Sequence, residues 1–420
     1  MATLVLTAVG SLVGGPVGTA VGAILGQALD QRLLAPKGRR GPRLGDLTVQ
    51  TSTYGSAIPK LFGTMRVAGT VIWSTDLQES RDSSGGGKGR PATTNYSYSA
   101  SFAVALSGRS IRAVHRIWAD GKLLRGAAGD WKSEVGAFRL HQGDEDQAVD
   151  PLLAAVEGMD GTPAYRGTAY AVFEDLQLAD FGSRIPSLTF EVEADQEQAS
   201  LAMIAEVLSD GQVRGTTTSA VTGYAASGDS VRAAIEALAT LAPMSLRDAG
   251  DFLLVSPLGL ATELPVAELG ANAAGPRRAR VELDRQAAGT LPDEVAISYY
   301  EPERDYQTGL QRARRGGPSR RVERVELAAA IEAKAAKAAA ERRLADAWAE
   351  RTRATVRLPH SRMGLAAGDA LVLPGHAETF RVAGWTLEHM VIELSLVGVA
   401  GVQRSEEVAS AGRQTSEPDR

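Results

Sequence analysis

A glycine stands at every fourth position near the start of the chain, and this ladder constrains the fold more than any other feature. Its members are Gly10, Gly14, Gly18, Gly22 and Gly26, with apolar or small residues between them. A spacing of four nearly matches the helical repeat, so on a helix the glycines form one bare stripe. Such a stripe lets a second helix approach closely, while each glycine costs a helix about 1 kcal/mol relative to alanine. Residues 1–34 are therefore predicted to be a helix that needs neighbours, which indicates a subunit of an assembly.

The same segment allows other interpretations. From Leu4 to Leu29 it is long enough to cross a bilayer, although Pro16 and the glycines lower its hydrophobicity. It lacks the positive start and the clear cleavage site of a signal peptide. We favour a helix buried in a protein assembly, and membrane insertion is the main alternative, ahead of a signal segment or disorder.

Composition limits the class of protein. The 420 residues are enough for two or three domains. The formal net charge of -5 argues against broad binding to nucleic acid, because phosphate affinity comes from clustered lysine and arginine. The chain has no cysteine, which excludes disulfides, thiolate metal sites and cysteine nucleophiles.

The pattern along the chain predicts an α+β fold that is mainly β. Strand signals occur at 67–73, 96–106, 111–118, 169–176 and 187–192. The predicted organisation is a Gly-rich helix at 1–34, a basic linker at 35–46, a first β domain at 47–195 with a mobile loop at 79–95, a small α/β insert at 196–275, a second β domain at 276–401 and a disordered tail at 402–420. Alanine and charged residues predict a long helix at 320–353 within the second β domain.

The sequence offers little chemistry. The five histidines lack metal-ligand spacing. Glu174, Asp175 and Asp180 are close enough to suggest paired carboxylates for glycoside cleavage, but a strand turns adjacent side chains to opposite faces. We predict a protein that is not an enzyme, with no catalytic, cofactor-binding or metal-binding residues and no cofactor.

One basic cluster stands out, and it offers a candidate contact with a polyanion or a partner subunit. Its members are Arg312, Arg314, Arg315, Arg320 and Arg321, followed by Arg324. DNA phosphate or an acidic partner subunit would suit such a surface. The alternative, which we favour, is a solvated loop and helix start.

Three stretches together resemble a known family. They are Tyr54–Trp73, then Tyr96–Leu106 continuing into Arg116–Lys122, and finally Pro163–Leu176 followed by Phe181–Val192. In order and spacing they are similar to the N-terminal part of the tail-tip baseplate hub proteins of long-tailed phages and gene transfer agents, also called host-specificity or megatron proteins. The glycine ladder resembles the start of that family, and the likeness is weaker from residue 196 onward. The chain resembles a short form, without the TIM-barrel-like domain of the large relatives.

The resemblance implies a virion structural protein, made in the bacterial host cytoplasm and placed in the tail tip or baseplate. It implies a homotrimer in which two similar β domains per subunit match a hexameric tube. The hub would adapt the tail tube to the tip and close the channel before DNA ejection. Its expected partners are distal tail or tail tube proteins, the tape-measure protein, and tip or fibre proteins, while DNA passes through the channel without specific binding.

Two alternatives to the structural hub stay open at this point. One is a membrane-active tail-tip component that inserts its N-terminal helix into the host envelope, with a transient membrane contact. The other, less favoured, is an envelope glycan hydrolase.

Overall fold

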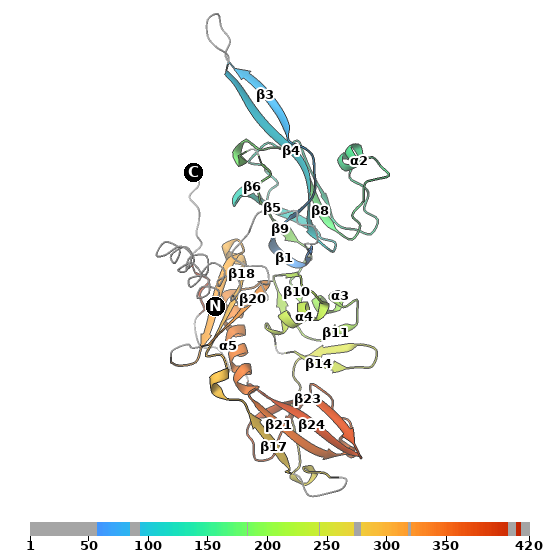
Figure 1. The fold of residues 1–420 in the computed structure, drawn as a ribbon, viewed down its shortest axis with the longest axis vertical. Coiled ribbons are helices and arrows are strands. Elements are labelled where there is room, and N and C mark those ends of the chain that lie inside the picture. Colours follow the sequence, from blue (N-terminus) through green and yellow to red (C-terminus); the bar gives the residue numbers. More distant parts are fainter. Residues whose placement is uncertain are drawn as a thin grey trace, which may run out of the picture. The chain divides into compact units, whose positions relative to one another are not determined.

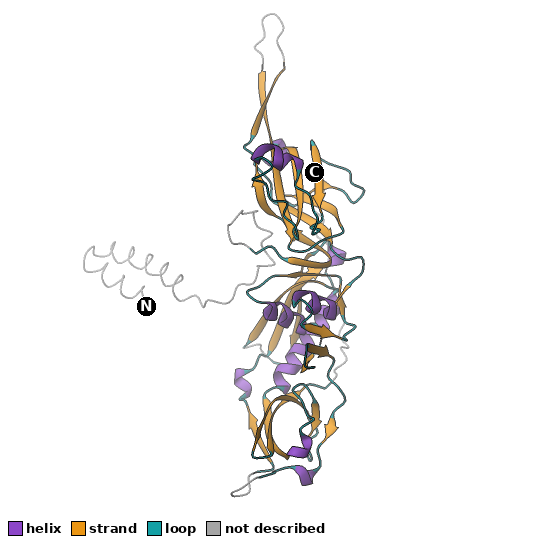
Figure 2. Ribbon diagram, turned by 90° about the vertical axis from the view of Figure 1, so that its right-hand side faces the viewer, coloured by secondary structure: helices purple, strands orange, loops and turns teal. Residues whose placement is uncertain are grey.

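The computed structural model describes residues 57–84, 93–182, 184–242, 244–272, 279–317, 321–401 and 409–412. The chain divides into two compact units, Met1–Arg43 and Leu44–Arg420, and the described residues belong to the second (Figure 1). The glycine ladder and the basic linker at 35–46 therefore lie outside the described residues. Strands outnumber helices in the described chain (Figure 2), which confirms the expected α+β, mainly β class.

The N-terminal β region holds nine strands, one short α-helix and one 3-10 helix, η1 (Ala179–Phe181), in its described part. The strands and the α-helix are β1 (Lys60–Ala68), β2 (Thr70–Ser74), β3 (Gln78–Ser84), β4 (Thr93–Ser107), β5 (Ala113–Ala119), β6 (Lys122–Arg125), β7 (Ala137–His141), α2 (Pro151–Glu157), β8 (Ala169–Gln177) and β9 (Leu188–Glu193). β4, β5, β8 and β9 confirm the strands expected there, whereas the one expected at 67–73 is divided between β1 and β2. A five-stranded sheet has the order β2-β4-β8-β7, with β3 paired to β4. Its core is rich in aromatic rings, and Phe102 stacks on Phe173 at 5.0 Å between centroids.

The predicted mobile loop at 79–95 is mostly wrong in its bounds. β3 and β4 pair without interruption from Gln78 opposite Ser99 to Ser84 opposite Thr93. Backbone pairing with a long neighbouring strand therefore extends the ladder into a Ser- and Asp-rich segment whose composition alone indicates a loop. Only the part between Ser84 and Thr93 lies outside the described residues.

The middle of the chain combines short strands with two capped helices. The elements are β10 (Ala199–Ser200), α3 (Leu201–Leu208), β11 (Val213–Gly215), β12 (Ala220–Val221), β13 (Gly223–Ala226), α4 (Val231–Ala239), β14 (Ser245–Asp248), β15 (Leu253–Ser256) and β16 (Thr262–Glu263). The Ser200 hydroxyl accepts a hydrogen bond from the Met203 N–H, and the Ser230 hydroxyl accepts one from the Ala233 N–H. These N-caps satisfy backbone donors that each helix start leaves free.

The C-terminal part holds the remaining elements. They are β17 (Val281–Arg285), β18 (Glu294–Glu301), β19 (Gln307–Arg314), β20 (Val322–Ala330), α5 (Ala333–Ala349), β21 (Thr352–Pro359), β22 (Ala370–Val372), β23 (Thr379–Glu388) and β24 (Val391–Val399). A six-stranded sheet has the order β16-β22-β23-β24-β21-β17 and encloses its own core, which includes Leu358, Phe380 and Leu394.

An eight-stranded sheet crosses the boundaries predicted between domains. Its order is β19-β18-β20-β13-β1-β9-β5-β6, so strands from all three predicted domains hydrogen-bond in one sheet. One core cluster also joins α3 and α4 to β18, β19 and α5. The predicted second β domain is thereby shared between this core and that of the six-stranded sheet. Sequence periodicity reports local structure and carries no record of such long-range pairing, which is why the boundaries differ.

The predicted helix at 320–353 is too long. Residues 322–330 form β20, which pairs with β18 in parallel and with β13 in antiparallel orientation, and α5 begins only at Ala333. Leu327 and Ala329 alternate into the core, and this pairing overrides the helical preference of the alanines. In α5 the buried alanines, Ala336 and Ala340 among them, let the helix pack closely against β18 and β19. Figure 1 shows α5 beside the sheet that contains β18 and β20.

The expected disordered tail at 402–420 contains a packed segment. Residues 409–412 are described, and Ala409 and Ala411 pack against the core that includes α5. The rest of that tail lies outside the described residues.

Candidate functional site

The predicted arginine cluster is partly brought together at the end of β19. Arg312 and Arg314 both contact Glu294 of the neighbouring strand β18, with N–O distances of 3.6 Å and 2.8 Å. The Glu294 side chain is only 3% exposed, so the two guanidinium groups cover and neutralise a buried carboxylate. These arginines thus have a structural task in addition to any contact with a partner.

The other members of the cluster have different neighbours. The Arg315 guanidinium lies 3.7 Å from the centroid of the Trp348 ring, a cation–π contact with α5. Arg321 donates a hydrogen bond of 3.2 Å to the Thr290 carbonyl. Arg324 is exposed on β20, and Arg320 lies outside the described residues. In the favoured interpretation, a solvated loop and helix start, the helix start is wrong. Arg321 directly precedes strand β20, and Arg324 lies on it.

A groove of about 460 Å³ runs beside this cluster, between β19 and α5. Lys337 of α5 donates a hydrogen bond of 2.8 Å to the Arg312 carbonyl, and its ammonium lies 3.5 Å from Glu341. Arg312, Arg314, Arg315 and Lys337 outnumber the single acidic lining residue, Glu341. Leu344 and two alanines, Ala313 and Ala345, complete the lining.

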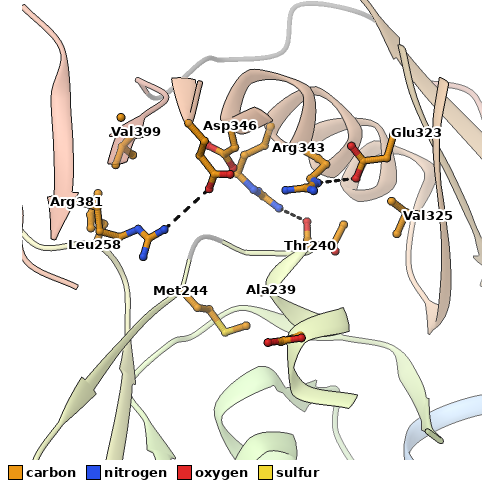
Figure 3. A pocket seen from close by; sticks show the side chains of 14 residues that line it. Ala239, Thr240, Met244, Leu258, Glu323, Val325, Arg343, Asp346, Arg381 and Val399 are labelled. Carbon is orange, nitrogen blue, oxygen red and sulfur yellow. Dashed lines mark hydrogen bonds and ion pairs between the residues drawn. The ribbon is translucent and has the colours of Figure 1, made fainter. Parts of the chain in front are cut away.

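A second pocket, of about 510 Å³, lies where α4, α5, β20 and the β23–β24 pair meet (Figure 3). Arg343 points toward Glu323 at 2.9 Å. Arg342 donates a hydrogen bond of 2.6 Å to the Thr240 carbonyl. Arg381 lies 3.9 Å from Glu350.

Burial perturbs two groups in this pocket in opposite senses. It lowers the pKa of Arg342 and raises the pKa of Asp346, since each charged form loses hydration. Arg342 and Asp346 each offset part of the other's shift by their mutual attraction. The pocket thus contains both basic and acidic side chains, and several of them bind groups on neighbouring elements.

A polar cluster that is absent from the predicted sites surrounds Asp150, which is fully buried. Its carboxylate accepts hydrogen bonds from Arg139 at 2.7 and 3.1 Å and from the Leu152 N–H, and lies 2.9 Å from His141. Burial by itself raises the pKa of Asp150, but the hydrogen bonds from Arg139, His141 and Leu152 outweigh it and lower the pKa to about 2. The available signal was the pair Asp150-Pro151, an N-cap followed by a proline at the first helical position.

The carboxylates weighed for glycoside cleavage have separate partners. Glu174 lies 2.7 Å from Arg139, whereas Asp175 accepts a hydrogen bond of 3.3 Å from the Ser101 hydroxyl. In the part of the chain that the structure describes, no group of three or more histidine, aspartate or glutamate side chains is placed to hold a metal ion. Within the same residues, none of the helices combines the length and hydrophobicity needed to span a membrane.

Comparison with known proteins points to one class of structure. Residues 230–385 match the model of a family described as "Putative phage tail protein". A chain from a structure described as the virion of a native gene transfer agent particle is 28% identical, with a TM-score of 0.70. That match covers 96% of this chain and 99% of the other. No curated protein matches the sequence.

Two further solved structures are much less similar. One is the tail protein from Neisseria meningitidis MC58, with 13% identity, a TM-score of 0.34 and coverage of 80% of this chain and 97% of that one. The other is a 43 kDa tail protein of prophage MuSo2 from Shewanella oneidensis, with 9% identity, a TM-score of 0.32 and coverage of 76% and 97%.

The resemblance to phage and gene transfer agent tail proteins is confirmed by the family match and by the virion chain. The family match lies in the region after residue 196, where the sequence motifs gave the weaker likeness.

Proposed function

Proceeding from this resemblance, we propose that the chain is a structural baseplate hub at the distal end of a phage-like tail. It adapts the tail tube to the tip and closes the channel before DNA ejection. In this role it is a virion component, which assembles as a homotrimer and contacts distal tail or tube proteins, the tape-measure protein, and tip or fibre proteins. DNA passes through the channel without specific binding.

The observation that carries the proposal is the extent of the likeness to the virion chain, which includes nearly the whole of both chains. A likeness confined to one domain would fit many functions, since folds are reused widely. A likeness that includes the order of sheets, inserts and helices favours a shared structural task.

The surfaces of the described residues support a role in assembly. The arginines at the end of β19 line a groove with an excess of positive charge, beside α5. Such a groove suits an acidic surface of a partner subunit, because complementary charge guides association and fixes orientation. We propose this groove, with Arg314 and Arg315 on its rim, as one of the hub's contacts within the tail.

Two separate cores suit the proposed ring. The core around Phe102 and Phe173 and the core around Phe380 and Leu394 each belong to a β-rich body. Three copies that each supply two such bodies would present six β modules to a hexameric tube, which is the symmetry the proposal requires.

The mass of the purified full-length chain under native conditions tests the oligomer directly. We expect three copies, and we expect the complex to bind the tube or distal tail protein of the same particle in a pull-down. As a control, substitution of the exposed Arg232, which pairs with Glu236 on its own helix, should change neither result. A stable monomer that fails to bind any tail protein would contradict the proposal.

A further inference from the structure

The described C-terminal segment, residues 409–412, lies against the edge of the eight-stranded sheet. Ala409 and Ala411 are half-buried and pack against the core that contains Tyr299, whereas Ser410 and Gly412 are exposed. Through Ala411 this alternation is that of an extended chain, which turns every second side chain toward the protein. At Gly412, with a φ of +79°, the N–H donates a hydrogen bond of 3.2 Å back to the Ser410 hydroxyl.

Two side chains donate hydrogen bonds to the backbone carbonyls of the segment. The Gln311 amide donates a hydrogen bond of 3.0 Å to the Ser410 carbonyl, and the Arg304 guanidinium donates one of 2.8 Å to the Ala411 carbonyl. Gly412 lies beside Arg304 with a φ of +79°, a backbone conformation that favours glycine. Both side chains therefore bind backbone carbonyls, while Ala409 and Ala411 turn small side chains toward the core.

Both donors belong to a built network. The Tyr299 ring is fully buried beneath Gly309, where a β-carbon would approach the ring to 2.5 Å. The Tyr299 hydroxyl donates a hydrogen bond of 3.0 Å to Glu301 and accepts one of 3.5 Å from Gln311. Arg304 also donates to Gln307 at 3.2 Å, while its buried Nε has no hydrogen-bond partner among the described residues.

We propose that Arg304 and Gln311 form a peptide-binding site for an extended segment with small residues at alternate positions. Its occupant is the chain's own C-terminal segment, in which Ala409 and Ala411 supply the small residues. The site stands independently of the proposed function.

The site also lies at a junction between two cores. Arg304 belongs to the turn between β18 and β19, and the next residue, Asp305, contacts Arg116 of β5 at 2.6 Å. Tyr306 then enters the core of the N-terminal β region. A bound segment therefore stabilises the turn that joins the two cores, and its release frees that turn.

Crosslinking in the full-length chain tests whether the site binds the C-terminal segment of the same chain or that of a second copy. Because the chain has no cysteine, a Gln311→Cys/Ser410→Cys variant carries only two thiols. We expect a short bis-maleimide to link them within one chain. The matched control is Leu310→Cys/Ser410→Cys, whose exposed position 310 lies on the opposite face of β19 and should not crosslink. Links formed only between chains would assign the segment to a second copy and overturn the proposal, as would no link at all.

Peptide binding provides a second test. A full-length Ala409→Glu/Ala411→Glu variant should vacate the site, because charged side chains would face the core. A fluorescent peptide of residues 405–416 should bind this variant at least about tenfold more tightly than the native chain. Adding Arg304→Ala should abolish that binding, and adding Leu310→Ala should leave it unchanged. Equal binding to the native chain, or binding that survives Arg304→Ala, would overturn the proposal.

Discussion

Gly63 and Gly223 lie directly opposite each other, where strand β1 leaves one partner strand for the next. Residues 60–63 of β1 pair with β13, and residues 64–68 pair with β9. Gly63 has a φ of +62°, and a β-carbon there would lie 2.2 Å from the Thr222 carbonyl oxygen. A β-carbon on Gly223 would meet the Thr64 carbonyl oxygen at the same distance. Two backbones thus approach as closely as glycine allows at the point that joins two cores.

Gly63→Ala should destabilise the fold by about 1–3 kcal/mol, because the added methyl group clashes with backbone and the positive φ disfavours any side chain. Urea unfolding at equilibrium measures the change. Gly289→Ala is the matched control, since a β-carbon there meets nothing within 4 Å. Equal stability of the two variants would show that the close approach is absent.

Asp150 should make stability fall in acid. Its folded pKa of about 2 lies below the ordinary value, so the carboxylate contributes stability that is present above about pH 4 and is lost as the pH falls toward 2. The contribution at neutral pH is about 2 kcal/mol. Denaturant titrations between pH 5 and pH 2.5 should show a shallower decline in Asp150→Asn than in the native chain. Parallel declines would contradict the assignment.

The arginines on β19 should act on stability through Glu294. The double variant Arg312→Ala/Arg314→Ala leaves a buried carboxylate without its two guanidinium neighbours, and we expect a loss of about 3 kcal/mol. Adding Glu294→Gln should restore part of that loss. Arg324→Ala, exposed on β20, is the control and should change stability by less than about 0.5 kcal/mol. A double variant as stable as this control would mean that the arginines have no structural task.

The glycine ladder lies outside the described residues and stays a prediction. Replacing Gly14, Gly18 and Gly22 with leucine should block particle assembly or DNA delivery, because bulk on the stripe prevents close helix contact. The measurement is the titre of particles that carry the variant. Alanine at the same positions is the milder control, and a normal titre from the leucine variant would refute the packing idea.

The sequence predicted local structure well and long-range pairing poorly. Alternation of polar and apolar residues predicts a strand at 96–106, and β4 confirms it, because this signal is local. β20 was mistaken for helix, since its alanines favour a helix until β13 and β18 pair with it. For the same reason the sequence did not predict that β13 pairs with β1 and β20, which are far from it in the chain.

In the candidate site, too, local features were predictable from the sequence and long-range contacts were not. Clustering of arginines in the sequence indicated a basic surface, and the structure brings Arg312, Arg314 and Arg315 together beside α5. Their partners Glu294 and Trp348 were not predictable, because both contacts depend on how β18 and α5 pack. The seating of residues 409–412 on Arg304 and Gln311 likewise has no local signal in the sequence.

The most direct test of the proposed hub is a cryo-electron microscopy map of the particle that carries this chain. The proposal predicts three copies around the tail axis at the distal end, between tube and tip. A map that places the chain elsewhere in the particle, or that shows no three-fold arrangement of it, would contradict the proposal.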